Sequence, residues 1–133
     1  MLKRLQARIA REESGFTLLE LLVVIVILGI LLAIAVPAYL GFKGRSQFAA
    51  AQSDVRSALP SVEAFASDNT TGYTGMTTAT LTSTYDKGFP KSIQAITVDT
   101  QSGYCIESKI DASHWAHVTG PGGTIKTSTA AKC

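Results

Sequence analysis

Asp111, Ser113 and His114 are the residue types of a nucleophilic triad, in which an acid orients a histidine that takes a proton from a serine. Here they lie within four consecutive positions. Side chains this close in sequence alternate between the faces of a strand or diverge around a turn, so we expect them not to converge on a substrate. The sequence therefore predicts no catalytic triad here.

The other candidates for metal or phosphate chemistry also lack the necessary spacing. His114 and His117 are three positions apart, which would place two ligands on one face of a helix but on opposite faces of a strand. The segment Gly120-Pro121-Gly122-Gly123 lacks the strand–loop–helix context of a phosphate loop and is typical of a hairpin turn. Three aspartates are too isolated to form a calcium loop: Asp86, Asp99 and Asp111. We expect no enzyme activity, no metal site and no cofactor.

Cys105 and Cys133 are the only two cysteines, and their spacing fits no zinc or redox motif. In an oxidising compartment they would form a disulfide that closes the C-terminal part of the chain. On the loop-entropy model this bond adds about 3 to 4 kcal/mol to the free energy of unfolding. In a reducing compartment they would remain two free thiols.

Glu20 is the only charged residue between positions 16 and 42. A carboxylate at membrane depth is costly, so an ionisable residue there is a functional candidate that needs a partner. Cleavage after Gly15 would supply this partner, because Phe16 would then carry a charged α-amino group close in sequence to Glu20. The simpler interpretation places the acid among the lipid headgroups at the membrane edge.

Residues 21–42 form an uncharged, mainly apolar run that is long enough to cross a bilayer as a helix. Three interpretations fit its composition: a secretory signal with a cleavage site at Ala33-Ile34-Ala35, a permanent anchor, or an anchor cut on its cytoplasmic side before the run. Glu20 favours the third, because a signal or a simple anchor gains nothing from a carboxylate.

The net positive charge of the chain lies in residues 1–15, which we interpret as a processed leader. Four basic residues outweigh two acidic ones in this segment, whereas from Phe16 onward eight of each sign cancel. The positive-inside rule then places the N-terminus in the cytoplasm and the C-terminal part outside, where a disulfide can form. The neutral body carries no basic footprint for a nucleic-acid partner.

After Arg45, apolar residues recur every three or four positions, as in an amphipathic helix with one buried stripe. The stripe consists of Phe48, Ala51, Val55, Leu59, Val62 and Phe65. Because no strong stop separates it from the apolar run, we predict one helix over about residues 16–67, roughly 75 Å long. Pro37 and Pro60 each remove a backbone hydrogen bond and should kink or open this helix, and Gly29 adds a weak point.

The C-terminal part divides into a threonine-rich loop and a segment rich in strands. Residues 68–91 lack a clear period and are predicted to form a surface loop with one helical turn near residues 77–81. Four later runs alternate in polarity or are β-branched, and turn residues separate them: 93–99, 103–110, 114–119 and 124–128. The sequence thus predicts an α+β fold in which a long helix packs against an antiparallel sheet of three to four strands.

Residues 15–30, with Pro37 beyond them, resemble the class III signal of type IV pilins. A basic leader ends in glycine, phenylalanine follows, glutamate comes four residues later, and an apolar run continues. The match is close over residues 11–43, and beyond it the likeness is architectural: a long helix, a threonine-rich loop, a small sheet and a C-terminal cysteine pair. The segment around Cys105 also looks like small pilin-like proteins of some Gram-positive bacteria.

The resemblance implies a role for each matched residue. Gly15 would mark the cytoplasmic cut made by a membrane-bound prepilin peptidase, and Phe16 would become the new, usually N-methylated, N-terminus. Glu20 would pair with the Phe16 amine of a neighbouring subunit. The helix between Gly29 and Pro37 would unwind on assembly.

We therefore expect a cleaved basic leader (1–15), a transmembrane and filament-core helix (16–45) and a pilin head (46–133). The resemblance implies a structural subunit that is held in the inner or plasma membrane. An assembly machinery with separate ATPases would then polymerise it into an extracellular helical filament, with no direct nucleic-acid partner. Two alternatives are a pseudopilin of a type II secretion or competence system and a membrane-tethered, monomeric binding module.

Overall fold

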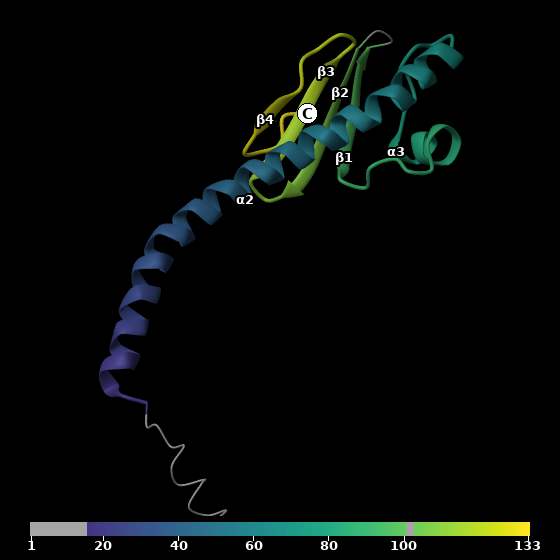
Figure 1. Cartoon of the computed structure of the whole chain (residues 1–133). Helices are drawn as coiled ribbons and strands as arrows, with labels where there is room; N and C mark the ends of the chain where they lie inside the picture. The colour runs from purple at the N-terminus through teal and green to yellow at the C-terminus, as the bar shows by residue number, and fades with distance from the viewer. Residues whose placement is uncertain (1–15, 101–102) are drawn as a thin grey trace, which may run out of the picture. The chain divides into compact units, whose positions relative to one another are not determined.

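A computed structural model describes residues 16–100 and 103–133 (Figure 1). The leader, including the predicted cleavage residue Gly15, lies outside the described residues. The elements are helix α2 (Leu18–Asp68), helix α3 (Thr78–Thr80), a π-helical turn η1 (Leu81–Tyr85), and strands β1 (Ile93–Thr100), β2 (Gly103–Asp111), β3 (His114–Gly120) and β4 (Lys126–Ser128). The chain divides into two compact units, Met1–Leu40 and Gly41–Cys133.

The first unit is described from Phe16 and contains the N-terminal part of α2, whose start is capped by Thr17. The backbone N–H of Glu20 donates to Thr17 Oγ1 at 3.1 Å, and the N–H of Leu21 donates to the Thr17 carbonyl at 3.2 Å. The first bond gives a partner to an N–H group that has none within the helix, whereas the second is the first backbone bond of the helix itself. The helix therefore begins at Leu18, and the Thr-x-x-Glu capping pattern is a signal that the sequence analysis missed.

The apolar side chains of this part of α2 are exposed, from 43% for Val24 to 87% for Leu18. By length and composition the helix is able to cross a membrane. Because burying apolar surface stabilises a protein by about 25 cal/mol per Å², an apolar environment around this segment would stabilise it.

In the second unit one stripe of α2 is buried, as predicted, although not every predicted member of the stripe lies in the core. Ala51, Val55, Val62 and Phe65 lie in the core with Ala58, whereas the predicted members Phe48 and Leu59 are only half-buried. The helix is continuous through Pro37 and Pro60, so the predicted opening is not observed. Each proline removes one backbone donor while the neighbouring turns keep theirs.

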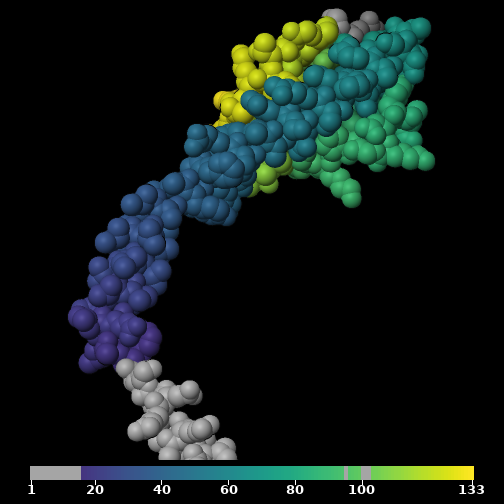
Figure 2. Space-filling model, viewed as in Figure 1, coloured from purple at the N-terminus to yellow at the C-terminus, as the bar shows by residue number. Residues whose placement is uncertain are grey.

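The sheet has four antiparallel strands in the order β1-β2-β3-β4, which confirms the predicted meander. Ile106 on the central strand β2 pairs with Ile96 of β1 and Val118 of β3. Residues that alternate along β2 and β3 are buried in one cluster with the stripe of α2. Figures 1 and 2 show the C-terminal part of α2 lying across one face of the sheet.

The prediction that residues 68–91 form a surface loop is wrong, because part of this segment is buried. Four of its apolar side chains belong to the core: Tyr73, Met76, Leu81 and Phe89. Their irregular spacing among threonines has no period, so the sequence did not reveal them. The predicted helical turn is present as α3 and continues into η1. Asn69 Nδ2 donates to the Phe65 carbonyl at 2.7 Å, so this side chain caps a carbonyl at the end of α2.

Candidate functional site

Phe16 and Glu20, the described residues of the predicted processing and assembly motif, lie beside and within the first turn of α2. Glu20 is exposed in the first turn of α2, where a negative charge interacts favourably with the helix dipole. Phe16 precedes the helix with 70% of its surface exposed. No described residue donates a hydrogen bond to the carboxylate of Glu20, so its charge faces outward.

Gly29 and Pro37 both lie within the helical span of α2. A Cβ atom added at Gly29 would meet nothing within 4 Å, so no packing within the described chain requires glycine at this position. Glycine lowers helix stability by roughly 1 kcal/mol relative to alanine. Among the described residues, no contact compensates for this loss of helix stability.

In the second unit, the carboxylate of Asp54 joins α2 to the sheet. Asp54 Oδ2 accepts hydrogen bonds from Ser92 Oγ at 2.6 Å and from Ser108 Oγ at 3.5 Å. Ser108 is fully buried on β2. A buried hydroxyl needs a partner, and the helix supplies it.

Glu63 joins the same helix to two tyrosines. Its Oε2 accepts from the Tyr73 hydroxyl and its Oε1 from the Tyr104 hydroxyl, each at 2.9 Å. The two rings meet edge to face with centroids 4.6 Å apart. Burial, followed by the Glu63 carboxylate, raises the pKa of both tyrosines above the ordinary value, because both effects disfavour a phenolate.

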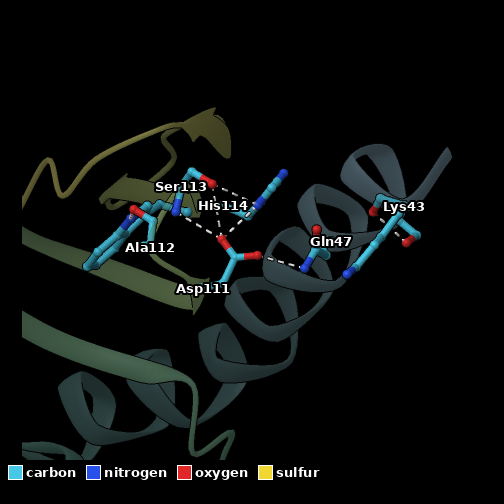
Figure 3. A network of polar contacts seen from close by, with 8 residues as sticks. Lys43, Gln47, Asp111, Ala112, Ser113 and His114 are labelled. Carbon is cyan, nitrogen blue, oxygen red and sulfur yellow. Dashed lines mark hydrogen bonds and ion pairs between the residues drawn. The ribbon is translucent and has the colours of Figure 1, made fainter. Parts of the chain in front are cut away.

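The prediction that Asp111, Ser113 and His114 diverge is wrong, because the turn between β2 and β3 brings their polar atoms together (Figure 3). Asp111 Oδ1 accepts from the Ser113 N–H at 2.9 Å and lies 2.7 Å from His114 Nδ1. Gln47 Nε2 donates to Asp111 Oδ2 at 2.6 Å, so the carboxylate also contacts α2. The Ser113 N–H, followed by the His114 side chain, lowers the pKa of Asp111.

This arrangement does not have the connectivity of a triad. Ser113 Oγ lies 3.3 Å from His114 Nδ1, the same nitrogen that Asp111 contacts. A triad needs the acid and the serine on opposite nitrogens of the ring, so that one side orients and the other accepts the proton. The His114 ring instead packs on Phe48, with centroids 4.5 Å apart. The cluster therefore attaches the turn to α2.

Cys105 and Cys133 form a disulfide with a Cα–Cα distance of 5.6 Å and a sequence separation of 28, as predicted. Beside it, Glu107 is 5% exposed, and its Oε2 accepts from the backbone N–H groups of Lys132 at 2.9 Å and Cys133 at 3.1 Å. The sequence analysis missed Glu107, because an acid on a strand is ordinarily expected on the solvated face.

The described residues contain no cluster of three or more His, Cys, Asp or Glu side chains placed to hold a metal ion. His114 and His117 fall at positions of opposite parity on β3, and strand side chains alternate between faces. The two imidazoles therefore do not share a site.

Comparison with known proteins places the likeness mainly in the N-terminal part. Residues 10–36 match the family model described as the prokaryotic N-terminal methylation motif. The chain is 31% identical over 122 residues to the type IV major fimbrial protein FimA of Dichelobacter nodosus, which covers 88% of this chain and 75% of that protein. No solved structure matches the chain.

Two further relatives match over shorter stretches. The type II secretion system core protein G of Pseudomonas aeruginosa is 37% identical over 59 residues, 44% of this chain and 42% of that protein. The type IV major pilin protein PilA of Myxococcus xanthus is 36% identical over 62 residues, 47% of this chain and 28% of that protein. These two matches span less than half of either relative.

Proposed function

The chain belongs to the type IV pilin family, and from this premise we propose that it is a pilin, a structural subunit that polymerises into a helical filament on the cell surface. One observation carries the proposal: α2 joins an apolar, exposed segment with a single charge to a segment whose stripe lies in a folded core. Lipid suits the first segment before assembly, and the packed helices of other subunits suit it afterwards.

Processing would create the mature subunit. A prepilin peptidase removes residues 1–15 by cutting after Gly15 on the cytoplasmic side, and Phe16 becomes an N-methylated amine that keeps its positive charge. The match of residues 10–36 to the methylation motif supports this step. Residues 16–45 then serve as the membrane and filament-core helix, and residues 46–133 form the head.

Glu20 would direct assembly through its charge. In a filament core the carboxylate loses its water and pairs with the Phe16 amine of a neighbouring subunit. Leaving one partner of such a buried pair alone costs about 3 to 5 kcal/mol. The contact is head-to-tail and does not close on itself, so it generates a helix.

The helix between Gly29 and Pro37 would unwind as subunits pack. Gly29 makes no contact that requires glycine, and Pro37 supplies no backbone N–H to the helix. Both features lower the free energy needed to open this turn without disturbing the head.

The partners would be copies of the same chain, the plasma membrane, the peptidase and an assembly machinery whose ATPases are separate proteins. The subunit resides in the membrane before assembly and in an extracellular filament afterwards. Its role is structural rather than enzymatic, and no nucleic acid is required.

A pseudopilin is the second candidate, and the 37% identity to the secretion system core protein G favours keeping it. Both candidates share the N-terminal helix. Fibre length separates them, because only a pilin is expected to yield long fibres in the sheared surface fraction at natural expression levels. The other alternative, a membrane-tethered monomer, would yield no fibres at all.

Glu20→Ala in the producing bacterium tests the proposal. We expect the variant to be cleaved after Gly15 and to reach the membrane, but to be absent from sheared fibres. Thr17→Ala is the matched control, because it removes only the side-chain cap at the same helix end. Normal fibres from Glu20→Ala would refute the assembly role, and a mature N-terminus other than Phe16 would refute the processing step.

A further inference from the structure

Two cations follow the apolar run of α2 directly. Phe42 ends the run with 66% of its surface exposed, and Lys43 and Arg45, both exposed, come within the next three positions. All three residues belong to the second unit, which begins at Gly41. We define the basic collar as Phe42, Lys43 and Arg45. It lies where α2 passes from an uncharged segment into the folded head.

The residue between the two cations contacts the head. A Cβ atom added at Gly44 would lie 3.4 Å from His114 Nε2, so this position of α2 faces the turn between β2 and β3. Successive residues of a helix are turned by roughly 100° about its axis. Lys43 and Arg45 therefore leave the helix on the two sides of this contact, and they diverge instead of sharing one pocket.

The Arg45 side chain is directed back toward the apolar run. Its Nε donates to the Gly41 carbonyl at 3.4 Å, one turn nearer the N-terminus. This bond holds the guanidinium at the level of Gly41 and Phe42, where the uncharged run ends. It is the only hydrogen bond of the Arg45 side chain among the described residues. The other N–H donors of the guanidinium are therefore open to an acceptor outside the subunit.

Little negative charge opposes the collar. The sequence has no acidic residue between Glu20 and Asp54. Asp111 approaches this part of α2 through its bond to Gln47, one turn after the first collar cation (Figure 3). The lowered pKa of Asp111 keeps it ionised at neutral pH, but the one ion pair among the described residues joins it to His114 and not to the collar. Two cations against this single carboxylate leave a positive surface.

The collar cations lie where the positive-inside rule does not favour them. In the orientation proposed above, the basic leader is cytoplasmic, so the collar emerges on the outer side of the membrane. A lysine or arginine at the end of a membrane helix is stabilised when its charge reaches the polar headgroups while its stem stays in apolar surroundings. Lys43 and Arg45 therefore require an anionic partner at the depth of the headgroups.

We propose that the basic collar binds the headgroups of anionic phospholipids, with Lys43 and Arg45 contacting phosphate groups and Phe42 lying among the acyl chains. Arginine suits phosphate because its planar fork can donate two parallel hydrogen bonds. The inference rests on the membrane-anchored subunit proposed above, and it adds the class of lipid that this subunit selects.

The geometry of the collar suits a lipid layer better than a single soluble anion. Because the two cations diverge, one small anion can contact only one of them. Residues 43 and 45 are only about 3 Å apart along the helix axis, so the phosphates of one lipid layer can reach both. The collar is also continuous with the segment that is long and apolar enough to cross a membrane.

The preference for one lipid over another tests the proposal. The full-length protein is reconstituted into vesicles of equal parts phosphatidylglycerol and phosphatidylcholine, and spin-labelled forms of each lipid report the fraction immobilised at the protein. We expect phosphatidylglycerol to be preferred, and the preference to weaken with added salt. Lys43→Gln combined with Arg45→Gln should lower the preference at least about fivefold, the effect of one cation near an anionic surface.

The matched control is Lys87→Gln combined with Lys91→Gln, which removes the same charge from exposed positions between α2 and β1. The basic leader is present in every variant, so its own attraction to lipid is the same in all of them. Circular dichroism and the intact disulfide mass establish that both double variants are folded. An equal loss of preference in both variants, or no preference in the unmodified chain, would overturn the proposal.

Flotation of the vesicles separates this inference from the proposed function. If the chain floats with vesicles of either single lipid but prefers neither, the membrane anchor stands and the lipid selection by the collar is refuted. If it floats with neither, both are refuted. An unchanged preference in the Lys43 and Arg45 variant, together with its loss from sheared fibres, would assign these cations to contacts between subunits instead.

Discussion

Glu63 Oε1 accepts a hydrogen bond from the Tyr104 hydroxyl at 2.9 Å, across 41 residues of sequence. The same carboxylate accepts from Tyr73 through its other oxygen. One side chain of α2 therefore positions both the segment after the helix and the central strand of the sheet. Because these groups are far apart in sequence, the bonds form only when helix and sheet are docked in the native register.

This contact predicts a loss of stability at alkaline pH. The folded-state pKa of Tyr104 is raised above its ordinary value of 10.0. Its stabilising contribution is therefore complete below about pH 10 and disappears as the pH rises through the folded-state pKa. The melting temperature should fall above pH 10, and the fall should be smaller in Tyr104→Phe. Identical pH profiles for the two proteins would contradict this role of Tyr104.

The attachment of the β2–β3 turn predicts a complementary effect in acid. The pKa of Asp111 lies below its ordinary value of 3.8, because the Ser113 N–H and His114 stabilise the carboxylate. Its contribution is present above about pH 3.8 and is lost as the pH falls through the folded-state pKa. In Asp111→Asn, the melting temperature should therefore fall less steeply as the pH is lowered into the acid range. Asp99→Asn, an exposed acid elsewhere on the sheet, should leave this fall unchanged.

Removing the helix side of that attachment should also destabilise the head. Gln47→Ala deletes the donor that lies 2.6 Å from Asp111 Oδ2. Hydrogen bonds to charged groups contribute about 1.5 to 3 kcal/mol, and less where water can replace the donor. We expect a loss of about 1 kcal/mol in the free energy of unfolding by chemical denaturation. Gln52→Ala, on the same helix, serves as the control.

Glu107 should be needed to hold the C-terminal residues. Glu107→Ala leaves the N–H groups of Lys132 and Cys133 without their acceptor, whereas Glu107→Gln keeps an oxygen in place. We expect the alanine variant to lose about 1 to 3 kcal/mol and the glutamine variant less. Amide hydrogen exchange at Lys132 and Cys133 measures the effect directly. Unchanged exchange in the alanine variant would show that the disulfide alone suffices.

Gly120 should tolerate no side chain. A Cβ atom there would lie 2.0 Å from the Tyr104 ring, which is almost completely buried and bonded to Glu63. Overpacking of this kind costs about 1 to 3 kcal/mol. Gly120→Ala should therefore lower the melting temperature, whereas Gly41→Ala, where a Cβ atom meets nothing within 4 Å, should not. Equal stability of the two variants would contradict the steric argument.

Local sequence determined the elements of this protein. An apolar run followed by a three-to-four residue period specifies the long helix, and short alternating runs specify four strands, because periodicity records which face of an element is buried. The positions of Gly15, Phe16 and Glu20 just before that run carry the resemblance to the family without any tertiary contact. The disulfide followed from two cysteines and the expected compartment.

Tertiary structure decided which polar groups meet. The periodicity of α2 places Asp54 and Glu63 beside its stripe, but not the serines and tyrosines that they contact. In the turn at residues 111–114, Asp111 contacts both Ser113 and His114, although these side chains were expected to diverge. The backbone path of a turn decides which side chains meet, and the sequence does not specify that path. Glu107 lies on β2, but the backbone N–H groups that it accepts belong to Lys132 and Cys133, which are 25 and 26 residues later in the chain. Such contacts join residues distant in sequence, so they are set by the docking of elements and not by any local pattern.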